Sequence, residues 1–101
     1  MSRSVKSRSQ TARSIGQLCR EVERTLTYAL AAAADPRLRD VTLVAVEPSP
    51  DPSCVQVTVI ASDIAELAAC LERARGALRA ELARSLQRKR TPDLRFVIVP
   101  R

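Results

Sequence analysis

The sequence predicts an α+β domain in which helices cover one face of a three-stranded sheet. Two observations support this class: apolar residues recur at helical spacing over two long segments, and three shorter segments are rich in β-branched residues. Their order along the chain is helix, strand, strand, helix, helix, strand. A sheet with helices packed on one face is an α+β sandwich. The 101 residues suffice for one modest hydrophobic core.

The first helix is expected to begin at Arg13 and to end before Pro36, because the residue before a proline disfavours helical backbone. Residues 1–12 are expected to form a flexible basic tail, and residues 13–101 a single domain. Both aromatic residues, Tyr28 and Phe96, are expected in the core. The apolar stripe of the first helix consists of Ile15, Leu18, Cys19, Val22, Leu26, Ala29, Leu30 and Ala33.

Residues 41–47 and 54–61 are expected to pair as an antiparallel hairpin. The segment between them, PSPDPS, is typical of a turn. In the second run valines alternate with polar residues from Val55 to Val59, which predicts a sheet with one covered face. A third strand is expected at 94–99.

The second helical region contains a glycine at an unexpected place. Asp63 is predicted to cap this region, with Glu66 completing a capping box, and its apolar stripe is Ile64, Leu67, Leu71, Ala74, Leu78, Leu82, Ala83 and Leu86. One straight helix to Arg90 would measure roughly 42 Å, longer than the sheet. We therefore predict a kink at Gly76 that separates two helices. The alternative is a continuous helix in which Gly76 permits close packing.

Composition argues against several classes of function. The chain has no histidine, and its three cysteines form no CxxC pair, so a metal site and imidazole-dependent catalysis are not expected. We predict no cofactor and no enzymatic activity. No apolar run is long enough to span a membrane, and the N-terminus lacks a secretory h-region. Reduced core cysteines indicate a cytoplasm-like compartment, with an organellar transit peptide as a minor alternative.

The charge is strongly segregated along the chain. Residues 1–20 carry a net charge of +5, residues 21–70 of −5 and residues 71–101 of +6. Arginine provides fifteen of the seventeen basic residues and suits bidentate phosphate contacts. This distribution predicts a polyanionic partner.

The predicted element order resembles that of a type II KH domain, a nucleic-acid-binding fold. An Ala-x-Gly segment, Ala74-Arg75-Gly76, stands where ordinary KH domains have a GxxG loop. In this respect the chain resembles the ribosome-binding factor A family. The segments 35-DPRLRDVTLVAVEPSPDPS-53, 71-LERARGALRAELARSL-86 and 90-RTPDLRF-96 are similar to family motifs. The resemblance covers roughly Arg13 to Val99; members often continue further.

This resemblance implies binding to the free 30S ribosomal subunit, support of late 16S rRNA maturation and a role in growth at low temperature. It implies no chemistry, no small-molecule substrate and a monomeric, cytoplasmic protein. The predicted RNA contacts surround Gly76 and extend along both basic segments. They are Arg73, Ala74, Arg75, Gly76, Arg79, Arg84, Arg88, Lys89 and Arg90, with Arg3, Lys6, Arg8 and Arg13 as an N-terminal arm. With both aromatic residues in the core, we expect recognition of rRNA shape and backbone rather than of bases.

Two other functions are compatible with the residues. One is a KH-like module that binds single-stranded RNA outside the ribosome. The other is a protein-interaction domain that uses Glu21 and Glu23 of the first helix and whose binding depends little on salt.

Overall fold

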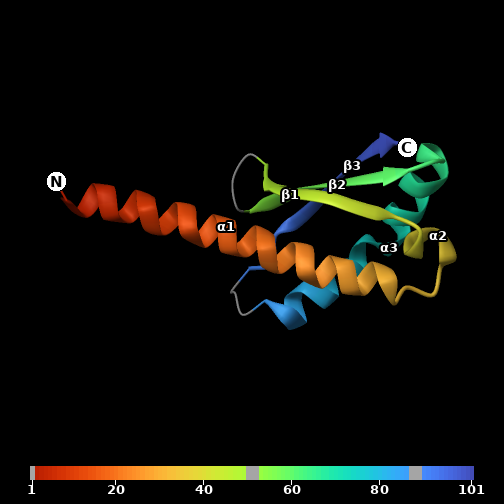
Figure 1. Cartoon of the computed structure of the whole chain (residues 1–101). Coiled ribbons are helices and arrows are strands. Elements are labelled where there is room, and N and C mark those ends of the chain that lie inside the picture. The colour runs from red at the N-terminus through yellow and green to blue at the C-terminus, as the bar shows by residue number, and fades with distance from the viewer. Residues whose placement is uncertain (1, 50–52, 87–89) are drawn as a thin grey trace.

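The sheet has the predicted three strands, and both long helices lie on one of its faces (Figure 1). The computed structural model describes residues 2–49, 53–86 and 90–101, with side chains from Ile15 onward. Its elements are α1 (Ser2–Ala31), α2 (Pro36–Arg39), β1 (Thr42–Pro48), β2 (Cys54–Ala61), α3 (Ile64–Ser85) and β3 (Asp93–Pro100). Strand β2 is central, antiparallel to β1 and parallel to β3. The α+β class and the hairpin are confirmed.

The core lies between the sheet and the two helices. Val55, Val57 and Val59 of β2 have no exposed surface, whereas the alternating polar residues of this strand are half-buried. Leucines of α1 and α3 pack over these valines. Burying one such side chain contributes roughly 1.5–3 kcal/mol relative to leaving it exposed. Cys19 and Cys70 belong to this core, as predicted, and Cys54 is half-buried.

Helix α1 is longer at its start than the sequence indicated. It begins at Ser2, so residues 2–12 are helical where a tail was expected. Figure 1 shows this first part of α1 projecting away from the sheet. The helix ends at Ala31, and Pro36 is the first residue of the short helix α2 rather than the stop of α1. Asp35 caps α2 by accepting a hydrogen bond from the Arg37 backbone N–H. Proline is well suited to a first helical position because it lacks an N–H to be left unpaired.

Helix α3 is continuous through Gly76, so the predicted interhelical kink between two helices is wrong. The helix ends at Ser85 instead of Arg90. Its 22 residues span about 33 Å, which removes much of the excess length that suggested a break. Close packing does not explain the glycine either, because a Cβ at Gly76 would meet nothing within 4 Å.

The start of α3 agrees with the prediction in part. The Asp63 side chain caps the helix by accepting a hydrogen bond of 3.0 Å from the Glu66 backbone N–H. The Glu66 carboxylate binds Arg37 on α2. Of the two hydrogen bonds of a capping box, the one to the Asp63 side chain is therefore present. The Glu66 side chain links α3 to α2 instead.

Three predicted core positions are wrong. Tyr28 is 75% exposed, Ile64 is 41% exposed, and Ala83 also lies at the surface. Phe96 is partly buried against the core, as predicted. Within the described residues, no helix is long and apolar enough to cross a membrane.

Candidate nucleic-acid interface

Two of the predicted contact arginines are bound to strand β3 or to the segment just before it. Arg75 donates a hydrogen bond to the Leu94 carbonyl, forms an ion pair with Glu72 and stacks its guanidinium over the Phe96 ring, 5.8 Å from the centroid. Arg79 donates to the Thr91 carbonyl at 3.3 Å and lies 3.4 Å from the Asp93 carboxylate. The Nε atoms of both arginines are buried without a hydrogen-bond partner in the described part of the chain. Arg75 and Arg79 therefore fasten β3 to α3.

The other predicted residues of this helix are more accessible. Arg73 is exposed and donates to the Cys70 Sγ at 3.5 Å, and Arg84 is exposed and forms an ion pair with Glu81. Gly76 is exposed and Ala74 half-buried. Arg90 is exposed at the start of the segment that leads to β3.

For six other predicted contact residues, either the whole residue or its side chain lies outside the described part of the chain. Arg88 and Lys89 lie outside the described residues. The residues of the predicted N-terminal arm lie on α1, and their side chains are outside the description: Arg3, Lys6, Arg8 and Arg13.

A groove of about 1090 Å³ separates α1 from α3. Its walls are made largely of alanines, which come from both helices and leave room beside larger neighbours. They are Ala29, Ala32, Ala33 and Ala34 on or after α1, and Ala74, Ala77 and Ala80 on α3. Arg24 and Tyr28 line the α1 side, and Glu81 and Arg84 the α3 side. The groove therefore combines an apolar lining with charged rims.

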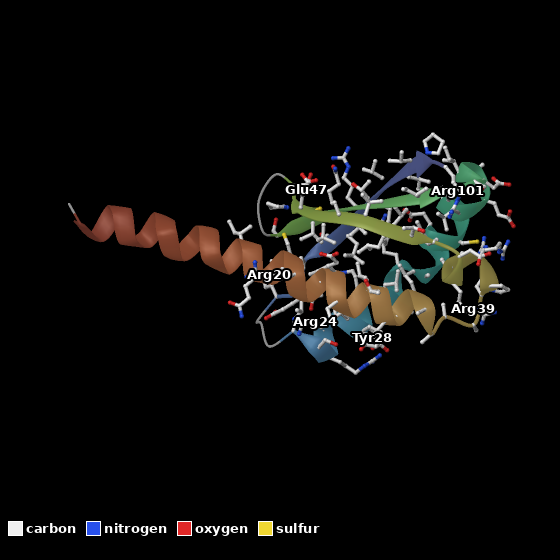
Figure 2. All side chains as sticks on the ribbon, viewed as in Figure 1. Arg20, Arg24, Tyr28, Arg39, Glu47 and Arg101 are labelled. Atoms are coloured by element: carbon white, nitrogen blue, oxygen red, sulfur yellow. The ribbon has the colours of Figure 1, made fainter. Side chains whose placement is uncertain are left out.

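Arg20, Arg24 and Tyr28 follow one another along α1, as Figure 2 shows. All three are exposed. Within the described residues, neither Arg20 nor Arg24 has an ion pair. The sequence-based prediction missed these residues, although their four-residue spacing, offset by two from the buried stripe of this helix, indicates a solvent-facing stripe.

The sequence matches the model of a known family over most of its length. The family model for ribosome-binding factor A matches residues 10–98. The chain belongs to the ribosome-binding factor A family.

Relatives of the family agree in sequence and in fold. Ribosome-binding factor A of Leuconostoc citreum (strain KM20) is 39% identical over 88 residues, which cover 81% of this chain and 75% of the relative. The crystal structure of ribosome-binding factor A from Thermus thermophilus is similar with a TM-score of 0.72 and 35% identity, covering 87% of this chain and 93% of that one. A homology model of the Thermus thermophilus factor, fitted into a cryo-electron-microscopy map of a 30S–RbfA complex, gives a TM-score of 0.64 and 38% identity. It covers 77% of this chain and 87% of that one.

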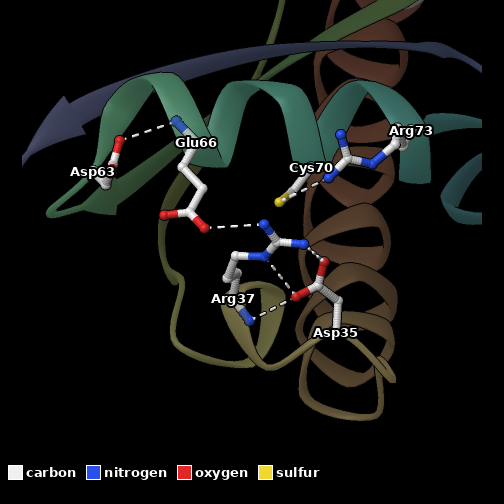
Figure 3. Close-up of polar contacts among 6 residues, drawn as sticks. All are labelled: Asp35, Arg37, Asp63, Glu66, Cys70 and Arg73. Carbon is white, nitrogen blue, oxygen red and sulfur yellow. Dashed lines mark hydrogen bonds and ion pairs between the residues drawn. The ribbon is translucent and has the colours of Figure 1, made fainter.

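In this member of the ribosome-binding factor A family, the segment Asp35-Pro36-Arg37 is part of a polar network (Figure 3). The Arg37 guanidinium binds the Asp35 carboxylate at 3.0 Å and the Glu66 carboxylate at 2.9 Å. Hydrogen bonds from the Arg37 side chain and backbone lower the pKa of Asp35 to about 2. The bonds to Asp35 and then to Glu66 raise the pKa of Arg37 above its ordinary value. The network ties α2 to α3 and gives this segment a structural role.

The acidic and sulfur-containing side chains of the described residues are dispersed. Among them, no three His, Cys, Asp or Glu side chains gather to hold a metal ion. Burial, followed by the nearby Glu47 charge, raises the pKa of the Cys19 thiol. A thiol that stays protonated is a weak nucleophile and a small apolar core group.

Proposed function

We propose that the chain binds the free 30S ribosomal subunit and supports late maturation of its 16S rRNA as a cytoplasmic, monomeric assembly factor without a cofactor. The observation that carries this proposal is the family match over residues 10–98. The Thermus thermophilus factor, which shares the fold, has been fitted into a 30S complex map. A role in growth at low temperature is part of the same proposal.

Among the described side chains, the exposed arginines of α3 and Arg90 are available for rRNA. Arg73 and Arg84 lie eleven residues, or about three turns, apart and have exposed side chains. The Arg84 ion pair with Glu81 is exposed, and such pairs are worth at most about 1 kcal/mol, so a phosphate can replace the carboxylate. Arg75 and Arg79 are partly exposed, and through their contacts at β3 they also contribute to the stability of the domain.

Co-sedimentation with free small subunits, large subunits and joined ribosomes across a salt series tests the proposal. We expect retention by small subunits alone, and weaker retention as salt rises, because phosphate contacts release counterions. A variant with Arg73→Glu and Arg84→Glu should bind less, with a salt slope lower by roughly 1 for each phosphate contact that is lost.

The matched control is the double variant Arg95→Glu and Arg101→Glu, which makes the same charge change at exposed residues on and just after β3. It should bind as the unaltered chain does. Equal retention by every RNA-containing particle would contradict a specific role at the small subunit. No retention at low salt would contradict the proposal and favour the protein-interaction alternative.

A further inference from the structure

The exposed Tyr28 ring is an unexplained feature of α1. Tyr28 is 75% exposed and is the single tyrosine of the chain. It lines the rim of the alanine groove between α1 and α3. Because the ring is largely exposed and the groove beside it is lined by alanines such as Ala29 and Ala32, the ring has room for a flat partner. An exposed aromatic ring beside arginines is the pattern on which unpaired nucleic-acid bases stack.

Tyr28 continues a stripe of arginines on the solvent side of α1. Arg20, Arg24 and Tyr28 are four residues apart, so each lies about 6 Å along the helix from the next and on the same face. Each also follows a buried residue of the core stripe by two positions, which places it roughly 200° around the helix from the core.

The charges that remain unpaired on this stripe are positive. Within the described residues, Arg20 and Arg24 form no ion pair. Of the acidic residues nearby, Glu21 accepts a hydrogen bond from Gln17 at 3.3 Å and Glu81 pairs with Arg84. Glu23, three residues after Arg20, is exposed and has no ion pair among the described residues. The partner suited to this face is therefore anionic along its length and presents a flat apolar group beside Tyr28.

We propose that this face of α1 binds single-stranded RNA, with an unpaired base stacked on Tyr28 and neighbouring phosphates on Arg24 and Arg20. This inference rests on the proposed function and names a second rRNA contact, on a different helix from Gly76. Guanidinium groups suit phosphates because their planar donors bind bidentately. Stacking on tyrosine tolerates any base, so the contact recognises an unpaired strand rather than a sequence.

The test measures binding of the full chain to a 12-nucleotide polyadenylate RNA and to inorganic polyphosphate, which carries charge but no bases. Tyr28→Ala should weaken RNA binding by about 5-fold to 100-fold and leave polyphosphate binding unchanged. Tyr28→Phe should bind RNA within about 2-fold of the unaltered chain, because the ring is kept. The double variant Arg20→Gln and Arg24→Gln should weaken both ligands. Arg95→Gln with Arg101→Gln is the matched control for the arginine pair. Added to this control, Tyr28→Ala should weaken RNA binding by the same factor as it does in the unaltered chain.

A second readout reports the ring directly. The chain has one tyrosine, one phenylalanine and no tryptophan, so the Tyr28 ring protons can be assigned in an NMR spectrum by comparison with the Tyr28→Ala variant. Stacking of adenine should shift them upfield, whereas polyphosphate should not. The thermal midpoint of Tyr28→Ala should match that of the unaltered chain, because an exposed ring contributes little to stability.

Several results would overturn the inference. Unchanged RNA affinity of Tyr28→Ala, or equal losses for RNA and polyphosphate, would show that no base stacks on the ring. Loss of small-subunit binding by Tyr28→Ala with unchanged RNA binding would assign this face to a protein. A different result separates the two proposals. If the unaltered chain fails to bind small subunits but Tyr28→Ala still weakens RNA binding, the proposed function fails and the stacking site stands.

Discussion

Helices α1 and α3 both carry several arginines, but the two helices use them differently. On α3, Arg75 and Arg79 bind carbonyl and carboxylate groups at or near the start of β3. On α1, Arg20 and Arg24 are exposed to solvent and have no ion pair among the described residues. The denser arginine cluster in the sequence is thus partly structural, and the sparser one is free for a partner. A count of basic residues does not distinguish these two uses.

The largest effect expected from this comparison is on stability. Arg75→Ala should lower the free energy of unfolding by about 1–3 kcal/mol, because it removes a charged hydrogen bond to the Leu94 carbonyl and the contact with Phe96. The exposed ion pair with Glu72 adds little. Arg24→Ala on α1 should change stability by less than about 0.5 kcal/mol. Urea denaturation of both variants measures the difference, and equal values would break the distinction between the two helices.

Gly76→Ala should have a smaller effect of the opposite sign. Because a Cβ at this helical position would meet nothing within 4 Å, alanine should stabilise the protein by roughly 0.5–1 kcal/mol. Thermal unfolding should then show a midpoint higher by a few degrees. The same variant also tests whether the surface of α3 around Gly76 contacts rRNA. If rRNA approaches the backbone at Gly76, binding to small subunits should weaken although the fold is more stable; unchanged binding would remove Gly76 from the predicted contacts.

The pH dependence of the Asp35 network is the most subtle expected effect. The Asp35 pKa falls from an ordinary value of 3.8 to about 2, so its ionised form is favoured by the folded state. The stability from this shift is present above pH 3.8 and is lost as the pH falls toward 2. Asp35→Asn should therefore be less stable than the unaltered chain at neutral pH, and the difference should shrink in acid. A constant difference across this acid range would contradict the role of the charge.

Much of the fold could be predicted from the sequence because local patterns and tertiary packing agree. The valine alternation from Val55 to Val59 fixes which face of β2 is buried, and Asp63 stands where a helix cap is needed. The short helix α2 also has a signal, an Asp-Pro pair that suits an N-cap followed by a first helical residue. Proline suits the end of one helix as well as the start of another, so Pro36 alone does not decide between the two.

The candidate site could be predicted less well. Tyr28 is expected in the core because it falls inside a helical segment. It lies about 200° around α1 from the buried Leu26, however, so its position on the helix places it at the surface. The directions of Arg75 and Arg79 depend on where β3 lies after folding. Long side chains at the edge of a helical stripe can turn either way, so spacing alone does not decide between a structural and a binding arginine.

The parallel pairing of β2 with β3 has a consequence for how the chain folds. Strand β3 is the last element in the sequence and pairs with β2 along its whole length, from Cys54 and Asp93 to Ala61 and Pro100. The β1–β2 hairpin can form from neighbouring residues, but the other edge of β2 stays open until α3 has crossed over and β3 arrives. An open strand edge next to apolar side chains invites pairing with another chain. We therefore expect a chain truncated before β3 to be prone to aggregation, because the edge of β2 that β3 covers would stay open.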